Sequence, residues 1–250
     1  MLNRGKARFV ARFAETEADI AAAQRLRYLA FLANQDSAPR PDALDQDDFD
    51  SICKHVLVED QRSGTLVCCF RFLPLTNGGE ISRSYSAQYY ELSALEAFDG
   101  PMVEMGRFCI HPEWRDPAIL RVAWGAMTAY VQDSGVEMLF GCSSFAGTDA
   151  RDYYDAFAML RDKHIAPRRW LPKVKAPTVF RYARRLRRKP DRKRALLTMP
   201  PLLRTYLVMG GWVSDHAVVD PEMNTLHVFT GLEIRSIPPS RVRALRAGIG

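Results

Sequence analysis

The sequence has no long apolar segment. Nowhere in its 250 residues do about 18 uncharged apolar residues follow one another, which is the length that a membrane-spanning helix needs. The N-terminal stretch MLNRGKARFVARF also lacks the apolar core of a signal peptide, so we expect no secretion by that route and a cytoplasmic location. A hydrophobic content of 47% and a charged content of 26% are typical of a globular protein with a sizeable core.

The sequence also has no cysteine pattern typical of a metal site or a redox motif. The five cysteines are odd in number, lie in apolar runs, and form neither a CxxC pair nor a Cys/His cluster with the spacing of a zinc site. We therefore expect buried free thiols and no metal. The reactive alternative is a nucleophilic Cys109, because His111 lies two residues on and would point to the same side of a strand.

Positive charge is concentrated in one place. The net charge is +6, but residues 181–194, RYARRLRRKPDRKR, contain nine Lys/Arg and one Asp, a net of +8 that leaves the rest near −2. Such a run is either solvated or meets an anionic partner, such as nucleic acid, a membrane surface or an acidic carrier protein. Its one aromatic residue is Tyr182, whereas nucleic-acid binding favours several, so no nucleic-acid partner is expected.

The hydrophobic pattern predicts alternating strands and helices. We expect a strand at 8–15, a helix at 17–33 capped by Thr16, and a hairpin of 55–60 with 65–75 around Arg62-Ser63-Gly64. The further elements are a helix at 88–98, a strand at 102–111, a helix at 117–133, a strand at 136–142, a helix at 149–164, a helix from Met199 to Gly210, and a hairpin of 212–220 with 225–234. With no repeat or second core, we predict one domain, 1–250, with a basic insertion at about 165–197.

Five motifs in sequence order carry a family resemblance. They are RLRYLAF (25–31), DDFDSICKHVLVED (47–60), FRFLPLT (70–76), VEMGRFCIHPEWR (103–115) and MLFGCSSFAGTD (138–149). Together they resemble the ornithine acyltransferases of ornithine-lipid synthesis, within the GCN5-related acyltransferases. Residues 200–225 resemble the terminal part of the same family, often labelled hemolysin-like, so the resemblance covers roughly residues 8–232.

The resemblance implies a fold and a reaction. The fold would be α/β, with a GCN5-related acyltransferase-like mixed, mostly antiparallel sheet flanked by helices. The enzyme would transfer a 3-hydroxyacyl group from acyl carrier protein to the α-amine of L-ornithine and make lyso-ornithine lipid. The alternatives are acylation of another amine (glutamine, lysine or a homoserine-lactone precursor) and, outside the enzymes, a basic module that binds nucleic acid or a membrane surface.

The first four motifs also resemble the acyl-homoserine-lactone synthases, which likewise take acyl groups from carrier protein. Their pattern has an arginine and an aromatic residue in the first helix, acidic residues in the next loop, an arginine in the next strand, and a glutamate and an arginine in the fourth. In this sequence it falls on Arg27, Phe31, Asp47, Asp48, Asp50, Arg71, Glu104 and Arg107. GCSSFAGTD and the long C-terminal part favour the ornithine enzyme.

Acyl transfer to an amine requires proton removal, stabilisation of the thioester oxygen, and alignment of the reactants. Glu104 is the predicted general base, directly or through a water, because burial in a strand raises the pKa of a carboxylate. His111 is a second candidate base. The resemblance implies that a backbone N–H near 108–110 faces the thioester carbonyl. Alternatively, Glu104 only pairs with Arg107 or Arg71 and maintains the shape of the site.

Charged side chains are the candidates for binding ornithine. A guanidinium suits the carboxylate because it donates two parallel hydrogen bonds, and the acidic loop could receive the side-chain ammonium, unless that loop is simply a solvated turn. The predicted catalytic residues are Glu104, Arg107, Asp48 and Arg71. The predicted substrate-binding residues are Arg27, Phe31, Asp47, Asp50, Phe108, Cys109, Ile110, Ser143 and Ser144. GCSSFAGT has no GxSxG pattern and no assignable His/Asp partner, so we predict direct transfer without an acyl-serine.

The turn HPEWRDPAIL contains no glycine. Coenzyme A-dependent enzymes of this fold usually have a glycine-rich turn here that cradles the pyrophosphate, so we predict acyl-phosphopantetheine of acyl carrier protein as donor and no tightly bound cofactor. The predicted contacts with the carrier protein or an anionic membrane are Arg115, Arg121, Arg184, Arg185, Arg187 and Arg188. A peripheral location on the inner face of the cytoplasmic membrane and a solvated loop at 181–194 are both open.

Overall fold

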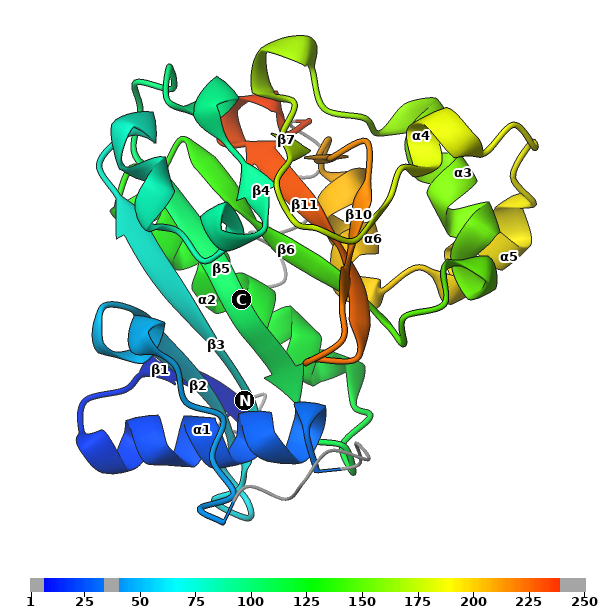
Figure 1. Cartoon of the computed structure of the whole chain (residues 1–250). Coiled ribbons are helices and arrows are strands. Elements are labelled where there is room, and N and C mark those ends of the chain that lie inside the picture. The colour runs from blue at the N-terminus through cyan, green and yellow to red at the C-terminus, as the bar shows by residue number, and fades with distance from the viewer. Residues whose placement is uncertain (1–6, 34–40, 239–250) are drawn as a thin grey trace, which may run out of the picture. The chain divides into compact units, whose positions relative to one another are not determined.

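The computed structural model describes residues 7–33 and 41–238 (Figure 1). The chain divides into two compact units. The described part of the first unit comprises 7–33, 41–73 and Met105–Ser134, and that of the second comprises Pro74–Glu104 and 135–238. Three segments lie outside the described residues, namely 1–6, 34–40 and 239–250. They include parts of the predicted single domain and the start of the N-terminal stretch in which no signal peptide was expected. The prediction of one domain stays a prediction.

The first unit contains a sheet with the strand order β1-β2-β3-β5. These strands are β1 (Phe9–Phe13), β2 (Lys54–Asp60), β3 (Leu66–Leu75) and β5 (Met102–Ile110), of which the end of β3 and the start of β5 belong to the second unit. β2 pairs antiparallel with both β1 and β3. Gly64, with a φ of 70°, makes the turn between β2 and β3, and the predicted hairpin is confirmed.

Helix α1 (Glu17–Phe31) covers one face of this sheet. Its N-terminus is fixed by Thr16, which accepts from the N–H of Asp19 in a capping box, as the sequence predicted. Ala23 and Leu26 pack against Leu57, Cys69 and Cys109 from three strands. Since side chains alternate between the two faces of a strand, the side chains next to Cys69 and Cys109 in sequence point to the opposite face of the sheet.

Helix α2 (Pro117–Asp133) covers the opposite face, and its observed bounds match the predicted ones. Asp116 accepts from the N–H of Ala118, and Pro117 at the first helical position needs no hydrogen-bond partner. Tyr130 stacks on Phe72 with ring centroids 4.6 Å apart. Local capping signals therefore determine where both helices of this unit begin.

The second unit contains the strand order β5-β6-β11-β10-β8, in which β5 and β6 are parallel and the other pairs are antiparallel. Its additional strands are β6 (Met138–Ala146), β8 (Val179–Phe180), β9 (Trp212–Val213), β10 (Ala217–Asp220) and β11 (Thr225–Glu233), with β4 (Tyr90–Glu91) and β7 (Lys173–Val174) as a separate pair. Its α-helices are α3 (Tyr154–Lys163), α4 (Tyr182–Arg185), α5 (Arg192–Thr198) and α6 (Pro201–Val208). The mixed, mostly antiparallel sheet with flanking helices agrees with the predicted fold class.

The helix predicted at 88–98 is wrong. These residues form the end of a 3-10 helix (Ser86–Gln88), strand β4, and a second 3-10 helix (Ser93–Leu95). The pairing of β4 with β7 keeps Tyr90 extended, and the hydroxyl of Tyr90 donates to the backbone carbonyl of His227 at 2.8 Å. This long-range contact overrides the helical spacing of the local apolar residues.

The described part of the second unit has buried side chains on both faces of its sheet. On one face of its sheet, α3, α4, α5 and α6 enclose a buried cluster that includes Phe145, Phe157, Tyr182 and Leu203. The other face carries Phe229, whose ring lies 5.7 Å from that of Tyr90. Among the described residues, no helix combines the length and the apolar character needed to cross a bilayer.

His227 on β11 is a buried histidine of this second face. It is 2% exposed, and its Nδ1 lies 3.1 Å from the Tyr90 hydroxyl. Burial lowers the pKa of His227 to about 4, with a further contribution from the charge of His216. The folded protein therefore holds His227 neutral over a range in which the unfolded chain protonates it.

Acidification should destabilise the protein through His227. Between pH 6.5 and pH 4 the unfolded chain takes up a proton that the folded protein does not, so up to about 3 kcal/mol of stability is present above pH 6.5 and lost by pH 4. The His227→Gln variant should show a correspondingly flatter pH dependence of its unfolding free energy, measured by urea denaturation. Identical slopes for the two proteins across this window would contradict the assignment.

Candidate active site

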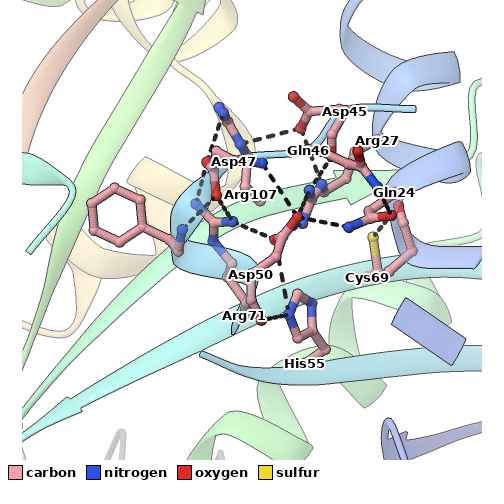
Figure 2. Close-up of polar contacts among 12 residues, drawn as sticks. Gln24, Arg27, Asp45, Gln46, Asp47, Asp50, His55, Cys69, Arg71 and Arg107 are labelled. Atoms are coloured by element: carbon pink, nitrogen blue, oxygen red, sulfur yellow. Dashed lines mark hydrogen bonds and ion pairs between the residues drawn. The ribbon is translucent and has the colours of Figure 1, made fainter. Parts of the chain in front are cut away.

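Three arginines and three aspartates gather within the first unit, and we call them the Arg–Asp cluster (Figure 2). The arginines come from α1, β3 and β5, and the aspartates come from the loop between α1 and β2. The members are Arg27, Arg71, Arg107, Asp45, Asp47 and Asp50. Their formal charges cancel, which is the condition under which several ions can be buried together.

The centre of the cluster is the pair of Arg27 and Asp50. Both terminal nitrogens of Arg27 donate to the Asp50 carboxylate at 2.7 Å, and Nε lies 3.0 Å from Oδ2 of Asp45. Gln24 lies one helical turn before Arg27 and donates to Asp50 at 2.9 Å. Burial opposes the charge of Arg27, yet the hydrogen bonds to Asp50 keep its pKa above the ordinary value. Helix α1 and the following loop are thus joined by ionised groups.

Arg71 extends the cluster outward. Its Nη1 lies 2.5 Å from both Asp47 Oδ1 and Asp50 Oδ1, and its Nη2 donates to Asp47 Oδ2 at 2.7 Å. Asp47 also caps the 3-10 helix at Asp48–Ser51 by accepting from the N–H of Phe49. The acidic loop is therefore more than a solvated turn, because it caps a 3-10 helix and supplies buried counter-ions. Its predicted contact with an ammonium group stays a prediction.

Arg107 forms the accessible edge. Its Nη2 donates to Asp47 Oδ2 at 3.1 Å, and its Nε lies 3.2 Å from Asp45 Oδ2. The side chains of Arg107 and Asp47 are 13% and 21% exposed, whereas those of Arg27 and Arg71 are 1% and 4% exposed. A small polar molecule can therefore reach Arg107 and Asp47 more readily than the interior of the cluster.

The backbone of Arg107 is strained. Its φ of 52° lies in the left-handed region, which costs an L-residue about 1–2 kcal/mol. A β-carbon on Gly106 would lie 3.9 Å from Nε of Arg71, and the guanidinium of Arg107 contacts the same aspartate as Arg71. Two successive residues of β5 therefore face the cluster, which interrupts the normal alternation of the strand.

The carboxylates of Asp47 and Asp50 are held in their ionised form. Burial alone would raise the pKa of Asp47 and of Asp50, but hydrogen bonds from Arg71 and Arg27 respectively lower each pKa below its ordinary value. His55 on β2 lies 3.0 Å from the backbone carbonyl of Asp50, and burial lowers its pKa. Among residues 7–33 and 41–238, no group of three or more His, Cys, Asp or Glu side chains is arranged to hold a metal ion.

The residues that the sequence analysis predicted for this region differ in burial and in their contacts. Arg27, Arg71 and Asp50 bind one another in the interior, and Phe31 packs beside the apolar cluster under α1. Asp48 is exposed, and its backbone carbonyl accepts from the Ser51 hydroxyl. Sequence reasoning did not single out three further members of the network, which are Gln24, Asp45 and His55. Asp45 lies within the acidic loop 41–50, but composition alone does not distinguish it from Asp42 or Asp48.

Glu104 lies in the second unit and is buried. Its carboxylate accepts from the backbone N–H of Tyr85 at 2.7 Å, from the N–H of Ser86 at 2.7 Å, and from the Ser86 hydroxyl at 2.6 Å. Such donors stabilise an ionised carboxylate that burial would otherwise disfavour. Ser86 Oγ also lies 3.4 Å from Cys142 Sγ. No sequence pattern indicated Ser86, because it is 18 residues from Glu104.

The two serines of GCSSFAGT lie on strand β6 rather than in the turn that follows it. Consecutive strand residues point to opposite faces, so the two hydroxyls do not share a site. Ser143 is buried and its hydroxyl accepts from Thr230 at 2.9 Å, whereas Ser144 is exposed. Their predicted contact with substrate stays a prediction.

Residues 108–110, where the resemblance places the thioester carbonyl, end strand β5. The ring of Phe108 stacks on Phe70 at 5.6 Å, and the Sγ of Cys109 lies 3.5 Å from that of Cys69. Burial raises the pKa of the Cys109 thiol well above its ordinary value, which disfavours the thiolate that a nucleophile needs. All five cysteines are free, and three of them are buried.

Breaking the charge balance of the Arg–Asp cluster should destabilise the protein. The Asp50→Asn variant leaves Arg27 and Arg71 with too little negative charge in a buried position, so the unfolding free energy should fall by roughly 3 kcal/mol or more. The matched control is Asp48→Asn, two residues away and exposed, which should change it by less than about 0.5 kcal/mol. An Asp50→Asn variant whose unfolding free energy, measured by denaturant titration, falls no more than that of Asp48→Asn would show that the cluster does not stabilise the fold.

Comparison with known proteins finds relatives that match most of the chain. Residues 26–125 match the acetyltransferase (GNAT) domain family. The chain is 32% identical over 235 residues to an L-ornithine N(alpha)-acyltransferase of Rhodobacter capsulatus, covering 90% of each chain. It is 30% identical over 240 residues to an L-ornithine N(alpha)-acyltransferase of Brucella abortus, covering 90% of this chain and 84% of that one.

Solved structures show the same fold. A coenzyme A-dependent acyl-homoserine lactone synthase has a TM-score of 0.52 at 15% identity and covers 98% of this chain and 90% of its own. An N-acyl amino acid synthase from uncultured soil microbes has a TM-score of 0.51 at 10% identity and covers 91% of this chain and 93% of its own. Both likenesses concern the fold alone. The sequence identity over nine-tenths of the chain goes further, and this chain belongs to the family of L-ornithine N(alpha)-acyltransferases, which are N-acyltransferases with the GNAT fold.

Proposed function

We propose that this enzyme transfers a 3-hydroxyacyl group from the phosphopantetheine arm of acyl carrier protein to the α-amine of L-ornithine, giving lyso-ornithine lipid. The observation that carries the choice of acceptor is the likeness to enzymes named for ornithine N(alpha)-acylation. In the reaction, the amine nitrogen attacks the thioester carbon and forms an amide. The C–S bond breaks, and the phosphopantetheine leaves as a thiol, whose sulfur carries the proton that the amine has lost.

The accessible edge of the Arg–Asp cluster supports an amino-acid acceptor. Arg107 and Asp47 present a cation and an anion 3.1 Å apart, both partly exposed. An amino acid carries the same two charges in complementary form, so its carboxylate can bind Arg107 while an ammonium group binds Asp47. In this assignment Arg27, Arg71 and Asp50 act from the interior by fixing the positions of the two accessible groups.

Glu104 is the general base of the proposal. The attacking amine must lose a proton, and a carboxylate held ionised by Tyr85 and Ser86 can accept it directly or through a water. A backbone N–H near Phe108, Cys109 or Ile110 would then stabilise the thioester oxygen as it becomes negative. No covalent acyl-enzyme is needed, because the amine attacks the donor directly.

The start of α2 supports acyl carrier protein as the donor. Pro117 has no N–H, and the N–H of Ala118 is already taken by the Asp116 carboxylate at 2.9 Å. The first turn therefore offers fewer donors to a pyrophosphate, and it carries a negative charge of its own. Arg115 and Arg121 are exposed beside this turn and are the proposed contacts for the acidic carrier. The basic run at 181–194 has two candidate partners, the carrier and an anionic bilayer.

The proposal is tested by supplying the purified enzyme with matched donors and acceptors. We expect 3-hydroxyacyl carrier protein and ornithine to give lyso-ornithine lipid, detected by mass spectrometry, at a higher kcat/KM than glutamine, lysine or homoserine-lactone precursors. Efficient transfer to one of those amines but not to ornithine would show that the acceptor is wrong. A preference for 3-hydroxyacyl-coenzyme A over the carrier-bound donor would overturn the donor assignment alone.

Replacing the proposed base should remove most of the activity. Glu104→Gln cannot accept a proton from the amine, so we expect kcat to fall by roughly 10²-fold or more in the same assay, with an unchanged circular dichroism spectrum. Near-wild-type turnover in this variant would eliminate Glu104 as the base.

Ser86→Ala provides the matched comparison, because it keeps the carboxylate and removes one donor to it. We expect a smaller loss of activity, and the acidic limb of its kcat/KM–pH profile should move to higher pH since the ionised form loses a hydrogen bond. A lowered rate with an unshifted profile would mean that Ser86 serves only the local structure.

A further inference from the structure

The second unit has an exposed apolar surface outside the residues assigned to the reaction. Leu197 on α5 is 81% exposed, and Leu196 beside it is 47% exposed. Val208 at the end of α6 is 52% exposed. Single exposed leucines are common on proteins, but two adjacent ones at the end of a basic run are not explained by that tendency.

Basic side chains are interleaved with these apolar ones. Arg192 and Lys193 precede Leu196 and Leu197 by four residues each, so they are neighbours on the surface of α5. Arg204 donates to the backbone carbonyl of Leu196 at 3.2 Å, and Val208 follows it by one turn on α6. We call the set Leu196, Leu197, Val208, Arg192, Lys193 and Arg204 the leucine–arginine surface.

The fold fixes the orientation of this surface. Ala195 on α5 and Met199 just after it are buried in the cluster that includes α3, so the other side of α5 faces outward. Figure 1 shows α3 and α5 side by side. Asp191 caps α5 by accepting from the N–H groups of Lys193 and Arg194. The exposure of Leu196 and Leu197 is thus a property of a packed helix.

A buried carboxylate anchors the basic run to α3. Asp155 lies 2.8 Å from Nη2 of Arg188 and accepts from the backbone N–H of Asp191 at 3.0 Å. Arg161, also on α3, donates to the backbone carbonyl of Arg188 at 3.0 Å. The basic run at 181–194, for which the sequence left a solvated loop open, is therefore attached to α3 near Arg188 and Asp191, while its charged side chains remain at the surface.

We propose that the leucine–arginine surface docks on an anionic lipid bilayer. Leu196 and Leu197 would enter the apolar boundary, and the neighbouring basic groups would contact the negatively charged headgroups. Charge complementarity alone would suit an acidic carrier protein equally well. The exposed leucines favour the bilayer, because a contact made through arginines requires no apolar side chain at the surface. The docking does not depend on the identity of the substrate.

The test uses the full-length enzyme and vesicles of phosphatidylcholine with or without an equal amount of phosphatidylglycerol. We expect co-sedimentation with the anionic vesicles, at least about tenfold tighter than with the neutral ones and weakened by added salt. The double variant Leu196→Ser/Leu197→Ser should bind about tenfold more weakly or worse, and Arg192→Gln/Lys193→Gln should lose much of the preference for anionic vesicles. Leu29→Ser, an exposed leucine of α1, is the matched control and should bind as the wild type does.

Two further readouts separate the alternatives. Turnover of a water-soluble short-chain donor should be unchanged in the double serine variant, so failed docking and a failed functional assignment are distinguishable. The proposal is overturned if wild type shows no preference for anionic vesicles or if the double serine variant binds them normally. It is also overturned if the variant changes only the affinity for acyl carrier protein or only the self-association seen by size-exclusion chromatography.

Discussion

The hydrogen-bonded ion pair between Arg27 and Asp50 is the contact on which the candidate site of the first unit depends. Each charged side chain would be unstable in the interior without the other. Removing either one would leave the other as an unpaired charge in a weakly polar environment. Asp50 in turn receives Arg71, and the loop that carries Asp50 also carries Asp45 and Asp47. The position of Arg107 at the accessible edge therefore follows from a pair that is itself buried.

This arrangement changes how a charge-rich acyltransferase motif is interpreted. The six charged residues of the Arg–Asp cluster look like six groups available to a substrate, yet four of them are buried among one another, namely Arg27, Arg71, Asp45 and Asp50. In the proposed function, their contribution to recognition is rigidity: the Arg107–Asp47 pair proposed to bind ornithine is already in place and loses little conformational freedom on binding. The same principle applies to Glu104, which the backbone of residues 85 and 86 holds by two N–H groups.

Local signals in the sequence predicted local structure well. The cap at Thr16, the proline at position 117 and the turn at Gly64 indicated the starts of α1 and α2 and the hairpin of β2 with β3, whereas the cap at Asp116 was seen only in the structure. Local signals could not predict contacts between residues that are far apart in the sequence. The Tyr90–His227 contact spans 137 residues and replaces a predicted helix with a strand, and the contact of Ser86 with Glu104 has no periodic pattern. The motifs named most members of the Arg–Asp cluster, whereas the pairing among them needed the fold.

The left-handed backbone of Arg107 restricts which sequences can occupy that position. Glycine and asparagine suit such a backbone, but neither carries the cation that Asp45 and Asp47 require. Lysine supplies the charge without the planar fork and without relief of strain. No single exchange satisfies backbone and side chain together, so a drift towards new acceptors should begin at Asp47 or outside the cluster, and position 107 should be among the last to change.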